Sequence, residues 1–274
     1  MTLLQSIILG IIQGFTEFLP ISSSAHLVIT PYLLGWKIPA QEGFIFDVLV
    51  QLGTLLAVIL YFRKDLYAII SAVIDGLVHR KPFSTPMARL GWMLVLGTIP
   101  AVIAGLLFKD TVERAFGSPV AVAFLLPGTA AFLVIAEVVG KRTRQLESMA
   151  WLDALIVGLF QAVALLPGIS RSGATITGGM LRDVDRPSAA RFSFLLSIPA
   201  MIGAGALAAL DLVRAPSFAN QVPTLAVGFI TAALIGYLSI RWLLSYLVKR
   251  PLYIFSIYCV CLSVVVLLFS ALQG

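Results

Sequence analysis

The sequence predicts an all-α integral membrane protein with six transmembrane helices and two broken-helix hairpins, arranged as an inverted-topology repeat. Three observations predict this fold class. Hydrophobic residues make up 59% of the chain and charged residues only 12%, whereas a soluble domain carries about 25% charged residues. Six apolar segments are long enough to cross a bilayer, and two polar segments in opposite halves of the chain resemble each other. The 274 residues suit a single membrane domain.

Each predicted span meets the length that a bilayer requires, which is about 20 apolar residues for an α-helix. The six spans are expected at 45–62, 90–108, 119–139, 192–213, 223–246 and 251–272. Two further apolar regions, 3–36 and 151–181, are each interrupted by polar residues, and neither half of either region is long enough to span. We expect both to be re-entrant hairpins, because irregular backbone at membrane depth is tolerated where protein or a wet cavity satisfies it.

The two interruptions share residue types at a constant offset of 148 positions. The matched pairs are Gly10 and Gly158, Gln13 and Gln161, Ile21 and Ile169, Ser22 and Ser170, and Ser24 and Ser172. Such internal similarity is typical of repeats whose shared site lies near the bilayer midplane. We therefore expect repeat halves of roughly 1–118 and 151–274, linked by the span 119–139, with the two hairpin tips in contact.

The basic residues predict the orientation in the membrane. If both hairpins return to the side from which they enter, 13 of the 19 lysines and arginines fall on one side, which the positive-inside rule assigns to the cytoplasm. Lys37, Lys109, Arg114 and Arg214 fall on the other side. The first hairpin then enters from outside and the second from the cytoplasm. Because the basic residues are scattered between spans, we expect no nucleic-acid partner.

The first hairpin carries a carboxylate, hydroxyls and an imidazole around its break. Gln13 and Glu17 lie four residues apart on one helical face, and Pro20 ends that half-helix. Ser22, Ser23 and Ser24 are candidate N-caps of the next half-helix, and His26 lies in its first turn. A helix N-terminus favours an anion, because its backbone N–H groups are free.

The second hairpin has the same build but contributes a cation. Pro167 and Gly168 make the break, and Ser170 or Ser172 can cap the following half-helix. Arg171 supplies a planar fork of donors suited to phosphate. Gly173 is expected to let the backbone approach a ligand, and Thr175 lies about one turn further on.

Together the two tips offer the groups that bind and cleave a phosphoryl group. Ser23 or His26 can attack phosphorus, and Arg171 can stabilise charge on the phosphoryl oxygens. Glu17 can act as a base, orient His26 or hold a divalent ion. The purely structural alternative is that Glu17 and Arg171 form only a buried ion pair. Asp47 and Gln51, four residues apart in the first span, line the cavity or serve packing, and Glu137 is expected to reach the interface.

These motifs resemble the bacterial undecaprenyl-diphosphate phosphatases, also called bacitracin-resistance proteins, over nearly the whole chain. The family's (Glu/Gln)-x-x-x-Glu motif matches Gln13 to Glu17, and Phe-Leu-Pro-x-Ser-Ser-x-x-His matches Phe18 to His26. Pro-Gly-x-Ser-Arg-Ser-x-x-Thr matches Pro167 to Thr175 at every fixed position. Position 13 is Gln where some members have Glu, which leaves one carboxylate fewer for a metal site.

The resemblance implies hydrolysis of undecaprenyl diphosphate to the monophosphate and inorganic phosphate, recycling of the lipid carrier for peptidoglycan, and bacitracin resistance. It also implies a divalent cation (Mg²⁺ or Ca²⁺), location in the bacterial inner membrane, and a site open to the periplasm or outside. A homodimer is left open. The implied catalytic set is Glu17, Ser23, His26, Ser170, Arg171 and Thr175, with Glu17 also as metal ligand. Substrate contacts are expected from Gln13, Ser22, Ser24, Gly168, Ser172 and Gly173.

Two alternatives stay open at this point. Ser23 is the preferred nucleophile if Glu17 and His26 serve as base and acid; the spacing of Ser23 and His26 lets them share a face and hydrogen-bond. His26 is the alternative nucleophile. A secondary transporter or lipid flippase that binds an anionic head group without cleaving it is the alternative function, because broken helices in inverted repeats are a transporter architecture.

Overall fold

The computed structural model describes the backbone of residues 1–108, 118–213 and 218–273, which is almost entirely helical. The two broken regions give four short helices: α1 (Leu3–Phe18), α2 (Ser23–Leu33), α8 (Trp151–Val163) and α9 (Arg171–Met180). The longer helices are α3 (Ala40–Tyr61), α5 (Pro86–Leu107), α7 (Pro119–Val139), α10 (Arg186–Val213), α11 (Phe218–Leu247) and α12 (Tyr253–Gln273). A 3₁₀ turn, η1 (Leu146–Ser148), precedes α8.

In the described parts of the chain six helices are long and apolar enough to cross a membrane, which confirms the predicted all-α membrane fold. Each predicted span coincides with one of them to within several residues. The segment between the first two predicted spans contains a further helix that was not predicted, α4 (Arg63–Val78), which continues from α3 after Phe62 and packs on α5. With 16 residues and charged residues at its start, it is shorter and more polar than a membrane span.

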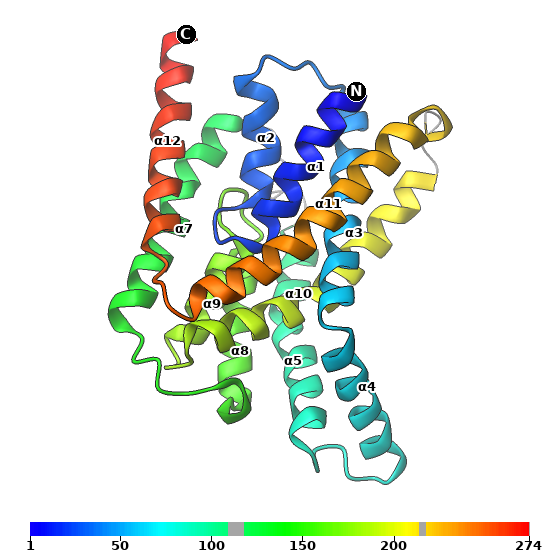
Figure 1. Cartoon of the computed structure of the whole chain (residues 1–274), viewed down its shortest axis with the longest axis vertical. Helices are drawn as coiled ribbons and strands as arrows, with labels where there is room; N and C mark the ends of the chain where they lie inside the picture. Colours follow the sequence, from blue (N-terminus) through cyan, green and yellow to red (C-terminus); the bar gives the residue numbers. More distant parts are fainter. Residues whose placement is uncertain (109–117, 214–217, 274) are drawn as a thin grey trace.

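Both predicted breaks are present. Helix α1 descends from the N-terminus and α2 returns beside it (Figure 1), while α8 and α9 pack on each other in the second half. The first helix of each pair packs tightly on a long helix of the other half: α1 on α11, and α8 on α5. A Cβ atom at Gly10 would lie 2.8 Å from the Gly228 carbonyl oxygen, and one at Gly158 would lie 2.4 Å from that of Gly97. The repeat-related glycines therefore occupy equivalent close contacts.

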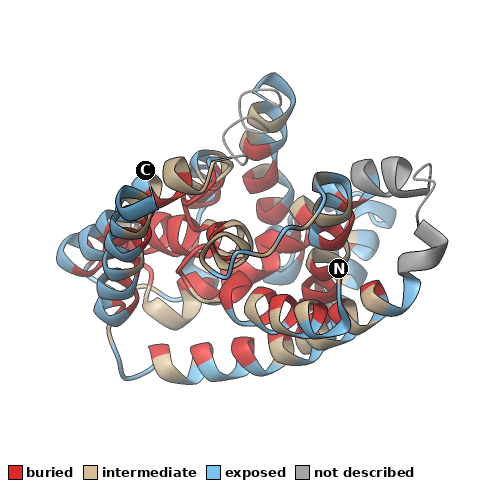
Figure 2. Ribbon diagram, turned by 90° about the horizontal axis from the view of Figure 1, so that it is seen from above, coloured by how far each residue is buried: buried red, intermediate tan, exposed pale blue. Residues whose placement is uncertain are grey.

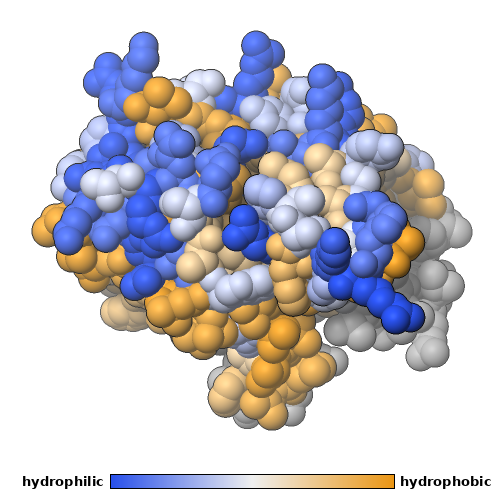
Figure 3. All heavy atoms as spheres, turned by 90° about the horizontal axis from the view of Figure 1, so that it is seen from below, coloured by the Kyte–Doolittle hydropathy of each residue, from blue (hydrophilic) through white to orange (hydrophobic). Residues whose placement is uncertain are grey.

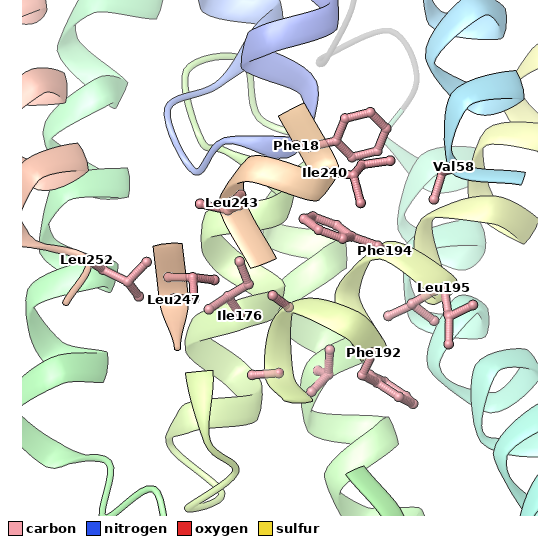
Figure 4. Packing of buried hydrophobic residues seen from close by; sticks show 14 of the residues in the cluster. Phe18, Val58, Ile176, Phe192, Phe194, Leu195, Ile240, Leu243, Leu247 and Leu252 are labelled. Carbon is pink, nitrogen blue, oxygen red and sulfur yellow. The ribbon is translucent and has the colours of Figure 1, made fainter. Parts of the chain in front are cut away.

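The core lies where the helices of both halves meet, and the perimeter is apolar and exposed (Figure 2). Phe18 at the end of α1 packs edge-on against Phe194 of α10, with ring centroids 5.3 Å apart. Side chains of α11, including Ile240 and Leu243, complete this cluster (Figure 4). Large apolar side chains such as Leu106 and Val138 are 71% exposed, which suits contact with lipid.

Two carboxylates anchor the end of the molecule that carries α8 and the loop before it. Glu137, near the end of α7, is buried within the protein, and its carboxylate accepts hydrogen bonds at 2.7 Å from Arg142 and Arg186. Asp153 in the first turn of α8 accepts bonds at 2.7 Å from Arg144 and Arg182. These arginines therefore neutralise both carboxylates, and the location of Glu137 at the membrane interface stays a prediction. Hydrophilic residues cover much of the surface seen from below (Figure 3).

Candidate functional site

The break of the first hairpin contains a residue with an unusual backbone conformation, Ser22. Helix α1 ends at Phe18, and Ser22 adopts a positive φ of 70° before α2 begins at Ser23. A positive φ is uncommon for a residue other than glycine. The Ser22 hydroxyl caps α2 by accepting from the Ala25 amide at 3.4 Å, so it is the N-cap among the three serines.

Glu17 is the centre of the polar contacts at this tip. Its Oε1 accepts a hydrogen bond from Nη2 of Arg171 in the other hairpin. Its Oε2 accepts from the Ser23 hydroxyl at 2.6 Å and from Nε2 of Gln13 at 3.0 Å. The carboxylate therefore lies between a guanidinium and a hydroxyl, and it accepts the hydrogen bond that the Ser23 hydroxyl donates.

His26 makes different contacts from those that the spacing allowed. Its Nδ1 lies 2.7 Å from the Ser22 carbonyl oxygen and its Nε2 lies 2.7 Å from the Tyr258 hydroxyl of α12. Because a carbonyl oxygen only accepts, the neutral ring donates from Nδ1 and accepts from Tyr258 at Nε2. The expected hydrogen bond between Ser23 and His26 is absent among these contacts, since the Ser23 hydroxyl donates to the carboxylate of Glu17 instead.

The second tip is held by α7. Gly168 has a φ of 95°, and its carbonyl oxygen accepts from the Thr129 hydroxyl at 2.9 Å. The same hydroxyl accepts from the Ser170 amide at 2.8 Å. The Ser170 hydroxyl caps α9 by accepting from the Gly173 amide at 3.1 Å. Gly173 packs closely against Ser170 and Thr129, and its contact with a ligand stays a prediction.

The two tips touch each other through side chains of α9. The Arg171 guanidinium reaches Glu17 and also the sulfur of Met201, at 3.3 Å. The Ser172 hydroxyl donates to the Leu19 carbonyl oxygen at 3.0 Å. Thr175 lies one turn further along, where its hydroxyl bonds the Arg171 carbonyl oxygen at 2.7 Å. The predicted meeting of the two polar segments is confirmed by these contacts.

A cavity of about 860 Å³ opens beside the first tip, between α1, α2 and α3. Its polar lining includes Glu17, Ser23 and Gln13, with Asp47 and Gln51 of α3. The apolar part of the lining is formed by Leu9, Leu27, Val28, Pro31, Trp36, Ile38, Phe44, Phe46 and Val48. A polar end beside a large apolar wall suits an amphiphile with a polar head.

The structure separates the predicted site residues into two groups. Glu17, Ser23, Gln13 and Ser24 line the cavity. The others hold or connect the tips by the contacts described above; they are Ser22, His26, Gly168, Ser170, Arg171, Ser172, Gly173 and Thr175. Arg171 is not part of the cavity lining and contacts Glu17, which is.

Four residues at the site were not predicted. Tyr258 and Thr129 hold the two tips, Met201 contacts Arg171, and the Ser193 hydroxyl lies 2.6 Å from that of Thr175. All four lie in long apolar helices. Tyr258 and Thr129, as polar side chains within apolar spans, carry the signal that could have identified them.

Comparison with known proteins agrees with this geometry. A family model described as bacitracin resistance protein BacA matches residues 6–265. The undecaprenyl-diphosphatase of Chlorobaculum tepidum is 48% identical over 272 residues, which cover 96% of this chain and 95% of that protein. The protein of the same name from Chlorobium phaeovibrioides is 46% identical and covers 98% of this chain and 97% of its own length. Because these matches extend over nearly the whole chain, it belongs to the bacitracin resistance protein BacA family.

Proposed function

We propose that this chain hydrolyses undecaprenyl diphosphate to undecaprenyl phosphate and inorganic phosphate, and so recycles the lipid carrier for peptidoglycan synthesis. One observation carries the proposal. The Ser23 hydroxyl donates to Glu17 at 2.6 Å on the wall of a cavity whose remaining lining is mostly apolar. An activated hydroxyl in this position can meet a phosphate head, while the apolar wall takes the start of an isoprenyl chain.

Ser23 is the nucleophile in this scheme and Glu17 is the general base. As the Ser23 oxygen forms a bond to the terminal phosphorus, its proton passes to Glu17 and the bridging P–O bond breaks. Undecaprenyl phosphate leaves with the bonding electron pair, and the serine carries the phosphoryl group. Once Glu17 has released that proton to water in the cavity, it takes one from the water that attacks the phosphoserine. Inorganic phosphate then leaves and the serine oxygen regains a proton.

Arg171 stabilises the phosphoryl group during both steps. A guanidinium presents five N–H donors in a rigid fork, and in the structure the contacts of one terminal nitrogen, with Glu17 and Met201, hold it at the site. The other donors are available for phosphoryl oxygens, where charge develops in the transition state. The N-termini of α2 and α9, which begin at Ser23 and Arg171, favour the same anion.

His26 positions the nucleophile. Its Nδ1 donates to the Ser22 carbonyl oxygen and so stabilises the positive-φ residue directly before Ser23. Its Nε2 is occupied by Tyr258. With both ring nitrogens engaged, the imidazole supports the bend instead of attacking phosphorus.

A divalent cation, Mg²⁺ or Ca²⁺, belongs to this proposal, and when bound it would neutralise charge on the diphosphate. The lining includes the side-chain oxygens of Glu17, Asp47, Gln13 and Gln51, which are the hard ligands that these ions prefer. The Gln13 Oε1 atom is buried and has no hydrogen-bond partner among the described residues, so it is available to such an ion.

The proposed setting is the bacterial inner membrane, with the end that carries Glu137 and Asp153 in the cytoplasm and the cavity open to the outside. The two helix pairs are then re-entrant hairpins of an inverted repeat. Of the four basic residues assigned to the outer side, Lys109, Arg114 and Arg214 lie outside the described residues. Abundant protein would confer bacitracin resistance.

Phosphate release by the purified protein in detergent tests the function directly. We expect undecaprenyl diphosphate to yield inorganic phosphate and, after an acid quench, an added phosphoryl group on the peptide that contains Ser23. An acid-labile phosphohistidine instead would favour His26. Binding of the lipid without any release of phosphate would favour the flippase alternative.

Labelling of introduced cysteines tests the orientation. A cysteine at Ser84, in the turn between α4 and α5, should resist an impermeant thiol reagent in intact cells. A cysteine at Ser118, the N-cap of α7, should react. The opposite pattern would invert the orientation and place the cavity on the cytoplasmic side.

A further inference from the structure

We infer that Asp47 is the carboxylate that holds a divalent cation together with the diphosphate head of the substrate, in place of Glu17. This inference rests on the proposed function for the identity of the anion. It concerns the wall of the cavity that α3 provides, opposite the reacting pair of Glu17 and Ser23.

The charges that line the cavity do not suit a bare diphosphate. Among the described residues that line it, the charged side chains are Glu17 and Asp47, and the one cationic group is the amino group of Met1. That amino group is paired with Glu42 at 2.8 Å, and the Glu17 charge is balanced by Arg171. Asp47 forms no hydrogen bond or ion pair with any described residue. Asp47 is therefore the one carboxylate of the lining that has no partner among the described residues.

Glu17 is a poor ligand because its oxygens are already engaged. Oε1 accepts from Arg171, and Oε2 accepts from Ser23 and Gln13. A cation bound there would displace the guanidinium or the Ser23 hydroxyl, and the chemistry needs both. Asp47 and the Gln51 side chain have no such contacts, and both face the cavity.

A second observation points to the same wall. Gln13 is only 2% exposed, and its Oε1 has no hydrogen-bond partner in the described parts of the chain. Its Nε2 approaches the Thr54 hydroxyl at 3.5 Å, and that hydroxyl donates to the Gln51 carbonyl oxygen. The Gln13 amide therefore lies close to the turn of α3 that contains Gln51 and Thr54.

Helix geometry separates the two carboxylates. Asp47 and Thr54 are seven residues apart on α3, which is about 10 Å along the axis at 1.5 Å per residue. The Met1 amino group meets Glu42 near the start of α3 and Gln13 meets α3 at Thr54, so α1 and α3 run in the same direction and Glu17 lies further from Asp47 than Gln13 does. A bound diphosphate with its terminal phosphorus at Ser23 would direct its other oxygens, and a cation on them, towards Asp47.

The small number of protein ligands agrees with this arrangement. The described residues contain no group of three or more His, Cys, Asp or Glu side chains arranged to hold a metal. Mg²⁺ commonly binds through one or two carboxylates together with substrate phosphates and water. The structure thus favours a metal that arrives with the diphosphate over a resident ion.

Binding of Mn²⁺, followed by electron paramagnetic resonance on the purified protein, tests the assignment without turnover. The anion is a methylene-bridged isoprenyl diphosphonate, which cannot be cleaved. We expect the diphosphonate to tighten Mn²⁺ binding to the wild type at least tenfold. Asp47→Asn should abolish that gain, and Asp47→Glu should restore part of it. Gln51→Met should weaken it about threefold, while Glu17→Gln should keep it and lose turnover.

The surface variant Asp75→Asn is the matched control, because that carboxylate is exposed and pairs with His79; it should bind Mn²⁺ like the wild type. Unchanged Mn²⁺ binding in both Asp47→Asn and Gln51→Met would overturn the inference, as would loss of binding in Glu17→Gln alone. Mn²⁺ binding that depends on Asp47, in a protein that releases no phosphate from the lipid diphosphate, would support the cation site and reject the proposed function.

Discussion

The helix pairs α1–α2 and α8–α9 are packed in a similar way but carry different polar side chains at their tips. The tip of α1–α2 contacts α12, through Tyr258 and through Cys259, whose sulfur lies 4.0 Å from the Pro20 carbonyl oxygen. The tip of α8–α9 contacts α7 through Thr129. Helices α7 and α12 pack on each other. Each tip is therefore held by one member of the α7–α12 helix pair, in addition to the glycine contact of its first helix.

The side chains at equivalent positions explain the difference in chemistry. The offset of 148 places Leu165 in the second pair where the first has Glu17, and Arg171 where the first has Ser23. In the proposed mechanism the first tip, which lines the cavity, supplies the base and the hydroxyl. The second tip supplies the Arg171 guanidinium, which contacts Glu17. The proposed chemistry therefore needs groups from both tips.

The largest expected effect comes from the reactive hydroxyl of the first tip. Ser23→Ala should lower kcat/KM for phosphate release by about 10³-fold or more, since nucleophile and base act as a unit. Ser172→Ala, which removes a hydroxyl of the second tip that bonds the Leu19 carbonyl oxygen, should cost about tenfold, within the range of a lost buried hydrogen bond.

The double variant Ser23→Ala with Glu17→Gln sharpens this result, because it should be little worse than either single variant. Ser197→Ala on α10 is the control; its hydroxyl bonds only the Phe194 carbonyl oxygen of its own helix. Full activity of Ser23→Ala would move the chemistry away from the first tip.

Much of this arrangement was predictable from the sequence, because polar residues in apolar segments are few and the paired motifs mark both breaks. The six spans followed from run length alone. Helix α4 did not, since charged residues flank a segment of only 16 residues. Tyr258 and Thr129 could not be joined to the tips, because each lies far along the chain from its partner. The spacing within α2 allowed a hydrogen bond between Ser23 and His26. The Ser23 hydroxyl donates instead to the carboxylate of Glu17, which lies on another helix, α1.

The second expected effect concerns the cation of the second tip. Arg171→Lys keeps the charge but loses the planar fork, so kcat/KM should fall about tenfold or more. Arg182→Lys is the matched control. It lies at the far end of the same helix pair and bonds Asp153, so its activity should stay within about twofold of the wild type, as expected for a partly exposed ion pair. Near-normal activity of folded Arg171→Lys would leave the second tip with a structural role only.

The third effect tests whether His26 positions the first tip or carries protons. Tyr258→Phe removes the hydroxyl on Nε2 but keeps the stacked rings, whose centroids lie 5.6 Å apart. Loss of one hydrogen bond of about 1 kcal/mol predicts a roughly fivefold decrease in kcat. The shape of the pH profile should not change.

His26→Asn separates the two roles further, because its amide can donate to the Ser22 carbonyl oxygen as Nδ1 does. We expect His26→Asn to keep clearly more activity than His26→Ala. Equal losses in these two variants, or a titration step that disappears from the pH profile of Tyr258→Phe, would instead assign a proton to the imidazole.

The smallest effect on activity is expected at the support of the second tip. Thr129→Val is nearly isosteric but leaves the Gly168 carbonyl oxygen and the Ser170 amide without the partner that both use. A buried polar group without a partner costs about 1–3 kcal/mol, so the melting temperature in detergent should fall by several degrees. Activity should fall only about twofold, because Arg171 is still held by Glu17 and Met201.

Thr129→Ser should restore the melting temperature. Thr98→Val is the control, since that hydroxyl bonds only the Leu94 carbonyl oxygen of its own helix. If Thr129→Val abolished activity while melting like the wild type, α7 would control the reacting groups and not only the stability of the tip.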